Sequence, residues 1–356
     1  MAKKIIIASV SIFLSLLLVV GGYVMYVIIA YYRIEDNLAL EVTNNNNSII
    51  EVNTDQLIMS FNTGFGAYSV DYSFFMDGGK YSRAFSKDEV LKNVNGMIST
   101  IESVNPNLLL LQEVDIDATR SYHVDQAKMF TDKLNKVSTF ALNYDSPYLF
   151  YPIFEPHGKS KAGLLTISNY RIENATRHSL PIETGFRKFL DLDRCYTKNI
   201  LKTSNNKNLV LYNVHLSAYT KDGTIATDQL VVLFEDMKKE FGNGNYIVCG
   251  GDFNKDLLQN SGEIFGVSGE DYSWAKPFPT EIIPDGFSLV SGYDESNPIA
   301  SCRDTEKPYV KGETFTITLD GFIVSSNVEY SNYKVIDAGF TNSDHNPVTM
   351  NFKLIG

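Results

Sequence analysis

The sequence is poor in the residues that build disulfide frameworks and zinc sites. Among 356 residues there are three cysteines, five histidines and one tryptophan. Three cysteines cannot form the dense, even-numbered framework of small secreted domains, although pairing of Cys195 with Cys302 stays open and Cys249 lies in a core-like strand pattern. The histidines and cysteines are also not clustered as zinc ligands are, which argues against a zinc site.

Two catalytic motifs are missing, and positive charge is scarce. The chain contains neither a glycine-rich phosphate loop nor a G-x-S-x-G nucleophile turn, which excludes P-loop nucleotide hydrolysis and the common serine-hydrolase mechanism. It has 31 Lys and Arg against 42 Asp and Glu, a net charge of −11. Such acidity disfavours holding duplex DNA through phosphate contacts alone, and it suits either a cation-dependent site or simple solubility.

A long apolar run near the N-terminus predicts a membrane anchor. Residues 5–32 carry no charge and are preceded by Lys3 and Lys4. This run exceeds the roughly 20 residues that cross a bilayer, and no small-residue cleavage pattern follows it. We therefore expect an uncleaved single-pass anchor in the cell membrane rather than a cleaved signal. The flanking lysines place the N-terminus in the cytoplasm and everything beyond Arg33 outside.

The rest of the chain predicts a spacer and one α/β domain. Residues 34–54 are polar, with an Asn run at 44–47, and we expect a flexible spacer there. The domain then covers residues 55–356. Apolar runs predict strands at 56–62, 107–112, 163–168, 208–215, 245–250, 315–325, 332–336 and 349–354, and helices at 86–104, 123–136 and 222–241. Helices between strands that are apolar on both faces indicate sheets covered by helices.

Acidic and polar residues recur beside the predicted strands. They are Asn62, Glu113, His215, Asp252, Asn254, Asp320, Asp344 and His345. Each alone is more often a turn cap or a structural residue. Together they indicate a site, because sheets of this kind bring their strand ends to one rim.

These residue types suit metal-dependent phosphoester hydrolysis. Glu113 and Asp344 offer the hard oxygen ligands that Mg²⁺ or Ca²⁺ prefers. Asp252 can orient or deprotonate water, and Asn254 can donate to a phosphate oxygen. His345, oriented by a carboxylate such as Asp320, can be a cation that stabilises developing negative charge.

Six segments in order, MSFNTG, LLLLQEVD, YNVHLSA, GGDFNKD, TLDGFIVS and NSDHNPVTM, resemble the endonuclease/exonuclease/phosphatase superfamily over roughly residues 55–355. The resemblance implies a four-layer α/β sandwich, two packed mixed sheets flanked by helices. It implies metal ligands at Glu113 and Asp344, with Asn62 supporting both the metal and the substrate phosphate. It also implies a divalent cation, Mg²⁺ first with Mn²⁺ or Ca²⁺ as alternatives. It further implies catalytic or phosphate-contacting roles for His215, Asp252, Asn254, Asp320 and His345.

A weaker correspondence concerns Glu155, which by the resemblance orients His215 or else is a surface-loop residue. The basic residues at 187–194 and Arg303 have two interpretations. They bind a substrate phosphate or, as is more common for such residues, they form structural ion pairs. The segment Tyr68–Phe75 is either core or an exposed aromatic hairpin.

The substrate class stays open among nucleic acid, a phospholipid headgroup and a soluble metabolite, because two family motifs differ here, at Ser168–Arg171 and Asp320–Ile323. We favour a nuclease-like phosphodiesterase displayed outside the membrane. A surface binding module that has lost catalysis is the alternative of another class, but no predicted metal or water position is eroded. No obligate protein partner is evident.

Overall fold

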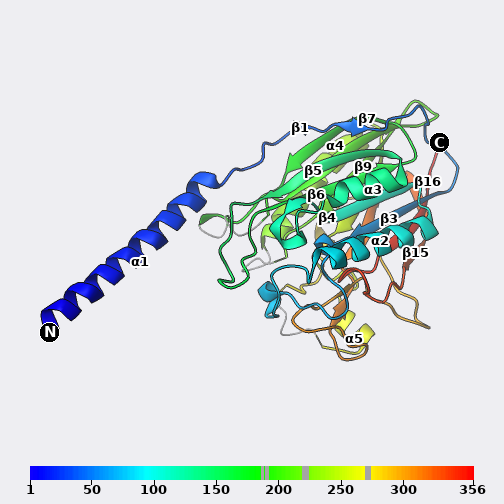
Figure 1. Cartoon of the computed structure of the whole chain (residues 1–356). Coiled ribbons are helices and arrows are strands. Elements are labelled where there is room, and N and C mark those ends of the chain that lie inside the picture. The colour runs from blue at the N-terminus through cyan, green and yellow to red at the C-terminus, as the bar shows by residue number, and fades with distance from the viewer. Residues whose placement is uncertain (186–187, 189–191, 219–223, 269–273) are drawn as a thin grey trace.

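The computed structural model describes residues 1–185, 188, 192–218, 224–268 and 274–356, and among these residues a pair of seven-stranded sheets packs face to face (Figure 1). The first sheet has the order β1 (Leu38–Ala39), β7 (Ile172–Ser179), β8 (Cys195–Lys202), β9 (Asn208–His215), β10 (Tyr246–Asp252), β14 (Asp320–Ser325), β11 (Phe287–Val290). The second has the order β15 (Val328–Val335), β16 (Val348–Leu354), β3 (Gln56–Asn62), β4 (Leu108–Ala118), β6 (Ser160–Ser168), β5 (Val137–Asp145), β2 (Val42–Thr43). Both are mixed, since β9 and β10 run parallel, as do β3 and β4.

Helices cover the outer faces and complete four layers, as the resemblance implied. Helices α2 (Lys87–Val104) and α3 (Gln126–Leu134) pack on the second sheet, and α4 (Thr224–Gly242) packs on the first. The apolar stripe of α2 lies in one core with β3 and β4, and that of α4 lies in another with β9 and β10. A third core fills the space between the sheets. Burial of these faces supplies the main stabilisation of such a fold.

Helix ends follow their sequence signals. The Ser86 hydroxyl accepts a hydrogen bond from Glu89 N at 3.1 Å and begins α2, which ends at Asn105 in the left-handed conformation. Asp125 caps α3 in the same way through Lys128 N. This cap places the helix start after the predicted residue 123, because a side-chain cap, and not the apolar pattern, sets the first turn.

The N-terminal helix α1 (Ala2–Ala30) is long and apolar enough to cross a membrane, with a mean hydropathy of 2.6 over its best 18-residue window. Within this helix only Val27 is buried, and Figure 1 shows it projecting away from the sandwich. Its apolar side chains need another environment than water, which fits an anchor.

Residues 34–54 differ from the free spacer that we expected. β1 pairs with β7 at the edge of the first sheet, and β2 pairs with β5 at the edge of the second. Ile50 is fully buried between the sheets. A polar composition hid these contacts because edge pairing uses backbone groups and needs few apolar side chains. The segment therefore covers one edge of each sheet.

Several predicted strands have other boundaries. β4 continues past Gln112 to Ala118 through a bulge opposite β6. The run 315–325 is split: Thr316–Ile317 forms β13, which pairs with β12 (Cys302–Arg303) in a separate ribbon, and β14 begins at Asp320. Strands β5, β7, β8 and β11 were not predicted. A short α-helix, α5 (Ser261–Phe265), lies where the sequence predicted no helix.

Candidate active site

Three neighbouring strands of the first sheet bring His215, Asp252 and Asp320 side by side. Asp252, the last residue of β10, pairs with His215 at the end of β9 and with Asp320 at the start of β14. The parallel and antiparallel neighbours therefore meet at one rim, as predicted for strand-end residues.

The second sheet contributes Asn62 and Glu113 from β3 and β4. Asn62 ends β3 and pairs with Gln112 in register. Glu113 lies in the bulge of β4 and has a φ of 55°. A left-handed conformation is costly for a glutamate, and a bulge re-aims one side chain without ending the strand. The bulge thus turns Glu113 toward the first sheet.

Ribbon β12 and residues 343–345 close the site from the third side. The backbones of Cys302 and His345 pair in an isolated antiparallel β-bridge, and Arg303 N donates to Asp344 O at 3.0 Å. The Ser343 hydroxyl donates to Asn62 O at 2.8 Å, which ties this loop to β3. Gly64 has φ +50°, and a Cβ there would lie 2.7 Å from Asp344 Oδ1, so the turn after β3 has room only for glycine.

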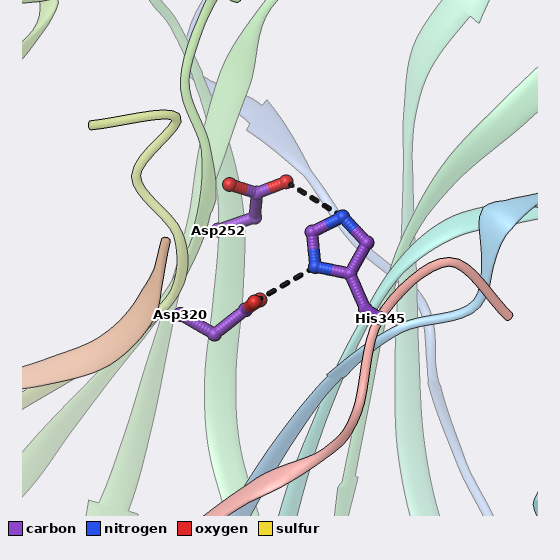
Figure 2. Close-up of side chains that lie close together, drawn as sticks. All are labelled: Asp252, Asp320 and His345. Atoms are coloured by element: carbon purple, nitrogen blue, oxygen red, sulfur yellow. Dashed lines mark hydrogen bonds and ion pairs between the residues drawn. The ribbon is translucent and has the colours of Figure 1, made fainter. Parts of the chain in front are cut away.

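His345 lies between two carboxylates (Figure 2). Its Nδ1 is 2.7 Å from Asp320 Oδ2 and its Nε2 is 3.7 Å from Asp252 Oδ2. Burial opposes the cationic form, but the charge and hydrogen bond of Asp320, together with the Cys302 side chain, outweigh it, and the pKa of His345 is raised well above 6.5. The Ser301 hydroxyl donates to the same Asp320 oxygen at 2.7 Å. Sequence reasoning missed Ser301, which has no motif of its own.

The pKa of Asp252 is raised to about 7, first by burial, while His345 opposes the shift. Such a carboxylate can accept a proton near neutral pH. Its Oδ1 accepts a hydrogen bond from Asn254 N at 2.8 Å, and Oδ2 accepts one from Asn62 Nδ2 at 3.0 Å. These contacts fix the carboxylate between the two sheets.

Glu113 and Asp344 form a half-buried acidic pair whose oxygens fit a divalent cation. Burial raises the pKa of both carboxyl groups, and the charge of Asp344 raises the pKa of Glu113 further. Two like charges in a buried site need a counter-cation or protonation. Their oxygens are the donor type that Mg²⁺ and Ca²⁺ take.

Asn62 has contacts that argue against a metal-ligand role. Its Oδ1 accepts a hydrogen bond from Gly64 N at 3.0 Å, which fixes the orientation of the amide. Its Nδ2 then faces Glu113 and Asp252, at 3.1 and 3.0 Å. In this orientation the amide directs its donors to the two carboxylates and its oxygen to Gly64 N, which favours a positioning role over a metal-ligand role.

Asp252, Asp320 and His345 also come close enough for a metal, with one ligand atom from each within 4.8 Å of the others. We interpret this group differently, because His345 Nδ1 and Asp320 Oδ2 are already joined by a short hydrogen bond. An ion bound through these same two atoms would break that bond and the one from Ser301.

His215 Nε2 lies 3.6 Å from Asp252 Oδ2 and 3.9 Å from Glu113 Oε1. Burial lowers the pKa of His215 well below 6.5, so its imidazole is neutral. Asn254, at φ 47°, donates from Nδ2 to Leu216 O at 2.8 Å. Among the residues that the structure describes, its second amide hydrogen has no acceptor and is available to a substrate, because an amide nitrogen carries two hydrogens.

Glu155 does not orient His215. Its carboxylate lies 3.4 Å from the Ser82 hydroxyl, and its backbone oxygen accepts a short hydrogen bond from the same group. Among the described residues, His215 Nδ1 is buried without a hydrogen-bond partner. Glu155 belongs to the β5–β6 connection on the second sheet, whereas His215 ends a strand of the first.

A pocket of about 130 Å³ opens over these groups. Its walls include the cations Arg120, Arg194 and Arg303 and the aromatic side chains of Phe65, Tyr68, Phe74 and Trp274. Arg120 had no sequence signal: it pairs with buried Asp115 at 2.8 Å, and its guanidinium lies 3.9 Å from the Phe65 ring centre. The Arg303 guanidinium donates hydrogen bonds to the backbone carbonyls of Ser69 and Tyr72. Arg187 lies outside the described residues.

Two other open questions from the sequence are answered. Tyr68, Tyr72 and Phe74 are buried, so Tyr68–Phe75 is core and not an exposed hairpin. Cys195, Cys249 and Cys302 are buried free thiols, and Cys195 and Cys302 belong to separate clusters. No disulfide joins them.

Residues 59–345 match the model of the Endonuclease/Exonuclease/phosphatase family, and the chain belongs to this family. Its members are hydrolases that act on phosphoester bonds and typically depend on a divalent metal. No curated protein sequence matches.

Solved structures share the fold at low identity. One is an endonuclease/exonuclease/phosphatase from Beutenbergia cavernae DSM 12333, with TM-score 0.58 and 14% identity over 85% of this chain and 72% of that one. ANGEL2, a 2′,3′-cyclic phosphatase solved with adenosine-2′,3′-vanadate, gives 0.56 and 16% over 90% and 99%. The human Nocturnin catalytic domain, with bound sulfate, gives 0.53 and 15% over 88% and 97%. At these identities the likeness establishes the fold alone.

Proposed function

We propose that this protein is a divalent-metal-dependent phosphodiesterase, nuclease-like in its chemistry, anchored by α1 and displayed outside the membrane. The observation that carries the proposal is the His345–Asp320 pair facing Asp252, with the acidic pair Glu113–Asp344 in the same pocket. Separately placed acid, base and cation-binding groups are what in-line displacement at phosphorus requires.

Each residue then has a defined task. Glu113 and Asp344 would hold the cation, which when bound neutralises charge on the phosphate. Asp252 orients the attacking water and takes its proton, in keeping with its raised pKa. His345 as a cation stabilises the negative charge that develops on the phosphate oxygens, and Asp320 holds its ring. Neutral His215 and the free hydrogen of Asn254 contact other phosphate oxygens.

The aromatic and arginine walls support a substrate with a flat organic group beside its phosphate. A ring such as that of Trp274 can stack on a base, and guanidinium groups suit phosphate. That a relative of the same fold is a 2′,3′-cyclic phosphatase is consistent with phosphodiester chemistry. A phospholipid headgroup or a phosphomonoester is the alternative, and the apolar N-terminal helix favours the former.

A substrate panel tests the proposal. The detergent-solubilised full chain is assayed with oligonucleotides, 2′,3′-cyclic nucleotides, phospholipids and phosphomonoesters, each with Mg²⁺, Mn²⁺ or Ca²⁺. We expect turnover of a nucleotide phosphodiester above the others. Phospholipid or monoester turnover alone would select the alternative, and no turnover of any substrate would favour the binding module.

A further inference from the structure

The connection between β5 and β6 has an exposed apolar tip. The exposed fraction is 53% at Phe150, 67% at Tyr151, 66% at Ile153 and 102% at Phe154. Soluble surfaces seldom gather so many bulky apolar side chains in one place. We call residues 150–154 the apolar tip.

The loop is an ordered hairpin that holds these side chains outward. Leu149 N and Gly158 N each donate to the other residue's carbonyl at 3.0 Å, and His157 N donates to Tyr151 O at 3.0 Å. The tip has no charged residue. Glu155, the next residue, is exposed, and its carboxylate lies 3.4 Å from the Ser82 hydroxyl at the base of the loop.

The same loop is bonded to the domain-proximal end of α1. The Tyr23 hydroxyl donates to Tyr148 O at 3.2 Å and accepts from Phe150 N at 3.0 Å. The Tyr26 hydroxyl accepts from Tyr148 N at 3.0 Å. Tyrosines near the end of a spanning helix lie at the membrane interface. A loop bonded to their hydroxyl groups lies at that level too.

We propose that the apolar tip inserts into the interface of the bilayer that α1 spans, so that the domain is attached to lipid at two points. A bilayer is a better candidate than a protein partner, because the loop that carries the tip is hydrogen-bonded to the helix that enters the membrane. Its aromatic, uncharged composition also suits the headgroup–acyl boundary.

The insertion would hold one wall of the catalytic pocket against the membrane. The Phe75 ring lies 5.9 Å from that of Tyr151 and 5.8 Å from that of His157. His157, at the base of the loop, and Met76, next to Phe75, both line the pocket. The tip and the pocket wall are therefore packed against each other.

A fluorescent label at the tip tests the proposal. Because the three native cysteines are buried, a thiol-reactive NBD group will react selectively with Phe154→Cys in the full chain. The chain is reconstituted in vesicles of phosphatidylcholine with some phosphatidylglycerol. The control is Tyr330→Cys, 46% exposed on β15 at the end of the molecule away from α1 (Figure 1).

We expect blue-shifted NBD emission at position 154. Lipids with a shallow acyl-chain nitroxide should quench the NBD group at position 154 several-fold more strongly than the one at position 330. Interfacial burial of about 5–10 Å would give that depth. Adding Ile153→Asp should return the emission toward that in water, and Ile153→Leu should not. Water-like emission at 154 would overturn the proposal.

Two further measurements keep the outcomes separate. Alkaline carbonate extraction reports whether α1 anchors the chain, and release of the unmodified protein would also overturn the proposal. Turnover of a soluble phosphodiester reports folding of each labelled variant and tests the proposed function independently, since insertion requires no catalysis.

Discussion

His345 Nδ1 lies 2.7 Å from Asp320 Oδ2. This bond both orients the imidazole and raises its pKa, so the two residues should act as one unit. We expect His345→Ala to lower kcat by about 10²–10³-fold, the usual loss of an electrostatic stabiliser. Asp320→Asn should reproduce some of that loss, and the double variant should be barely worse than His345→Ala. Steady-state kinetics on one phosphodiester measures all three, and additive losses would contradict the unit.

The left-handed backbone of Glu113 predicts a conflict between stability and function. At φ 55°, glycine is favoured over alanine. The free energy of unfolding of Glu113→Gly should therefore be about 1 kcal/mol higher than that of Glu113→Ala. Both variants should lose activity. Urea unfolding of the metal-free proteins makes the comparison.

Asp117, later in the same strand β4, supplies the control. It has no positive φ, so there glycine should be less stable than alanine by about 0.5–1 kcal/mol. The same sign at both positions would mean that the Glu113 backbone is not strained.

Buried His157 predicts an acid-sensitive element. Burial is the main cause that lowers its pKa from 6.5 to about 3, and Nδ1 contacts Ser82 O at 3.0 Å. Because the folded pKa is below the unfolded one, the unfolded chain binds the proton first. Stability is therefore lost as the pH falls from about 6.5 toward 3, at up to about 1.4 kcal/mol per pH unit.

His157→Gln, which can still donate to Ser82 O, should remove this loss. The difference in unfolding free energy between wild type and variant should shift in favour of the variant as the pH falls. Other titrating groups are common to both proteins and cancel. A pH-independent difference would show that His157 is not buried neutral in the folded chain.

The topology prediction concerns the N-terminal segment. Lys3 and Lys4 precede the apolar run of α1, and Arg33 follows it. Protease added to intact cells should degrade the chain beyond about Glu35 while α1 stays in the membrane fraction. A soluble, shortened chain in the medium would mean that the segment is a cleaved signal.

The sequence predicted the layers and the meeting of the strand-end residues because both depend on local patterns. The run 208–215 is β9 residue for residue, since a buried strand is apolar along its length. His215, Asp252 and Asp320 were expected to meet because strand ends share a rim, and they are direct neighbours.

What the sequence could not predict depends on three-dimensional contacts. Ser301 and Arg120 reach the site through bonds to Asp320 and Asp115, and serine or arginine at such positions has no periodic signature. The bulge at Glu113 needed the register of β6. The orientation of the Asn62 amide depends on its hydrogen bond from Gly64 N, and residue spacing alone does not predict such a bond. The boundaries of the domain at residues 34 and 55 stay predictions.

Metal-dependent phosphodiester hydrolysis through Glu113 is the central claim. The most direct measurement is the rate of bis(p-nitrophenyl) phosphate hydrolysis by the wild-type full chain and by Glu113→Gln, in EDTA and after addition of Mg²⁺, Mn²⁺ or Ca²⁺. We predict that EDTA abolishes wild-type hydrolysis, that one of these ions restores it, and that Glu113→Gln stays inactive at concentrations that saturate wild type. Undiminished hydrolysis in EDTA, or wild-type rates in Glu113→Gln, would contradict the account.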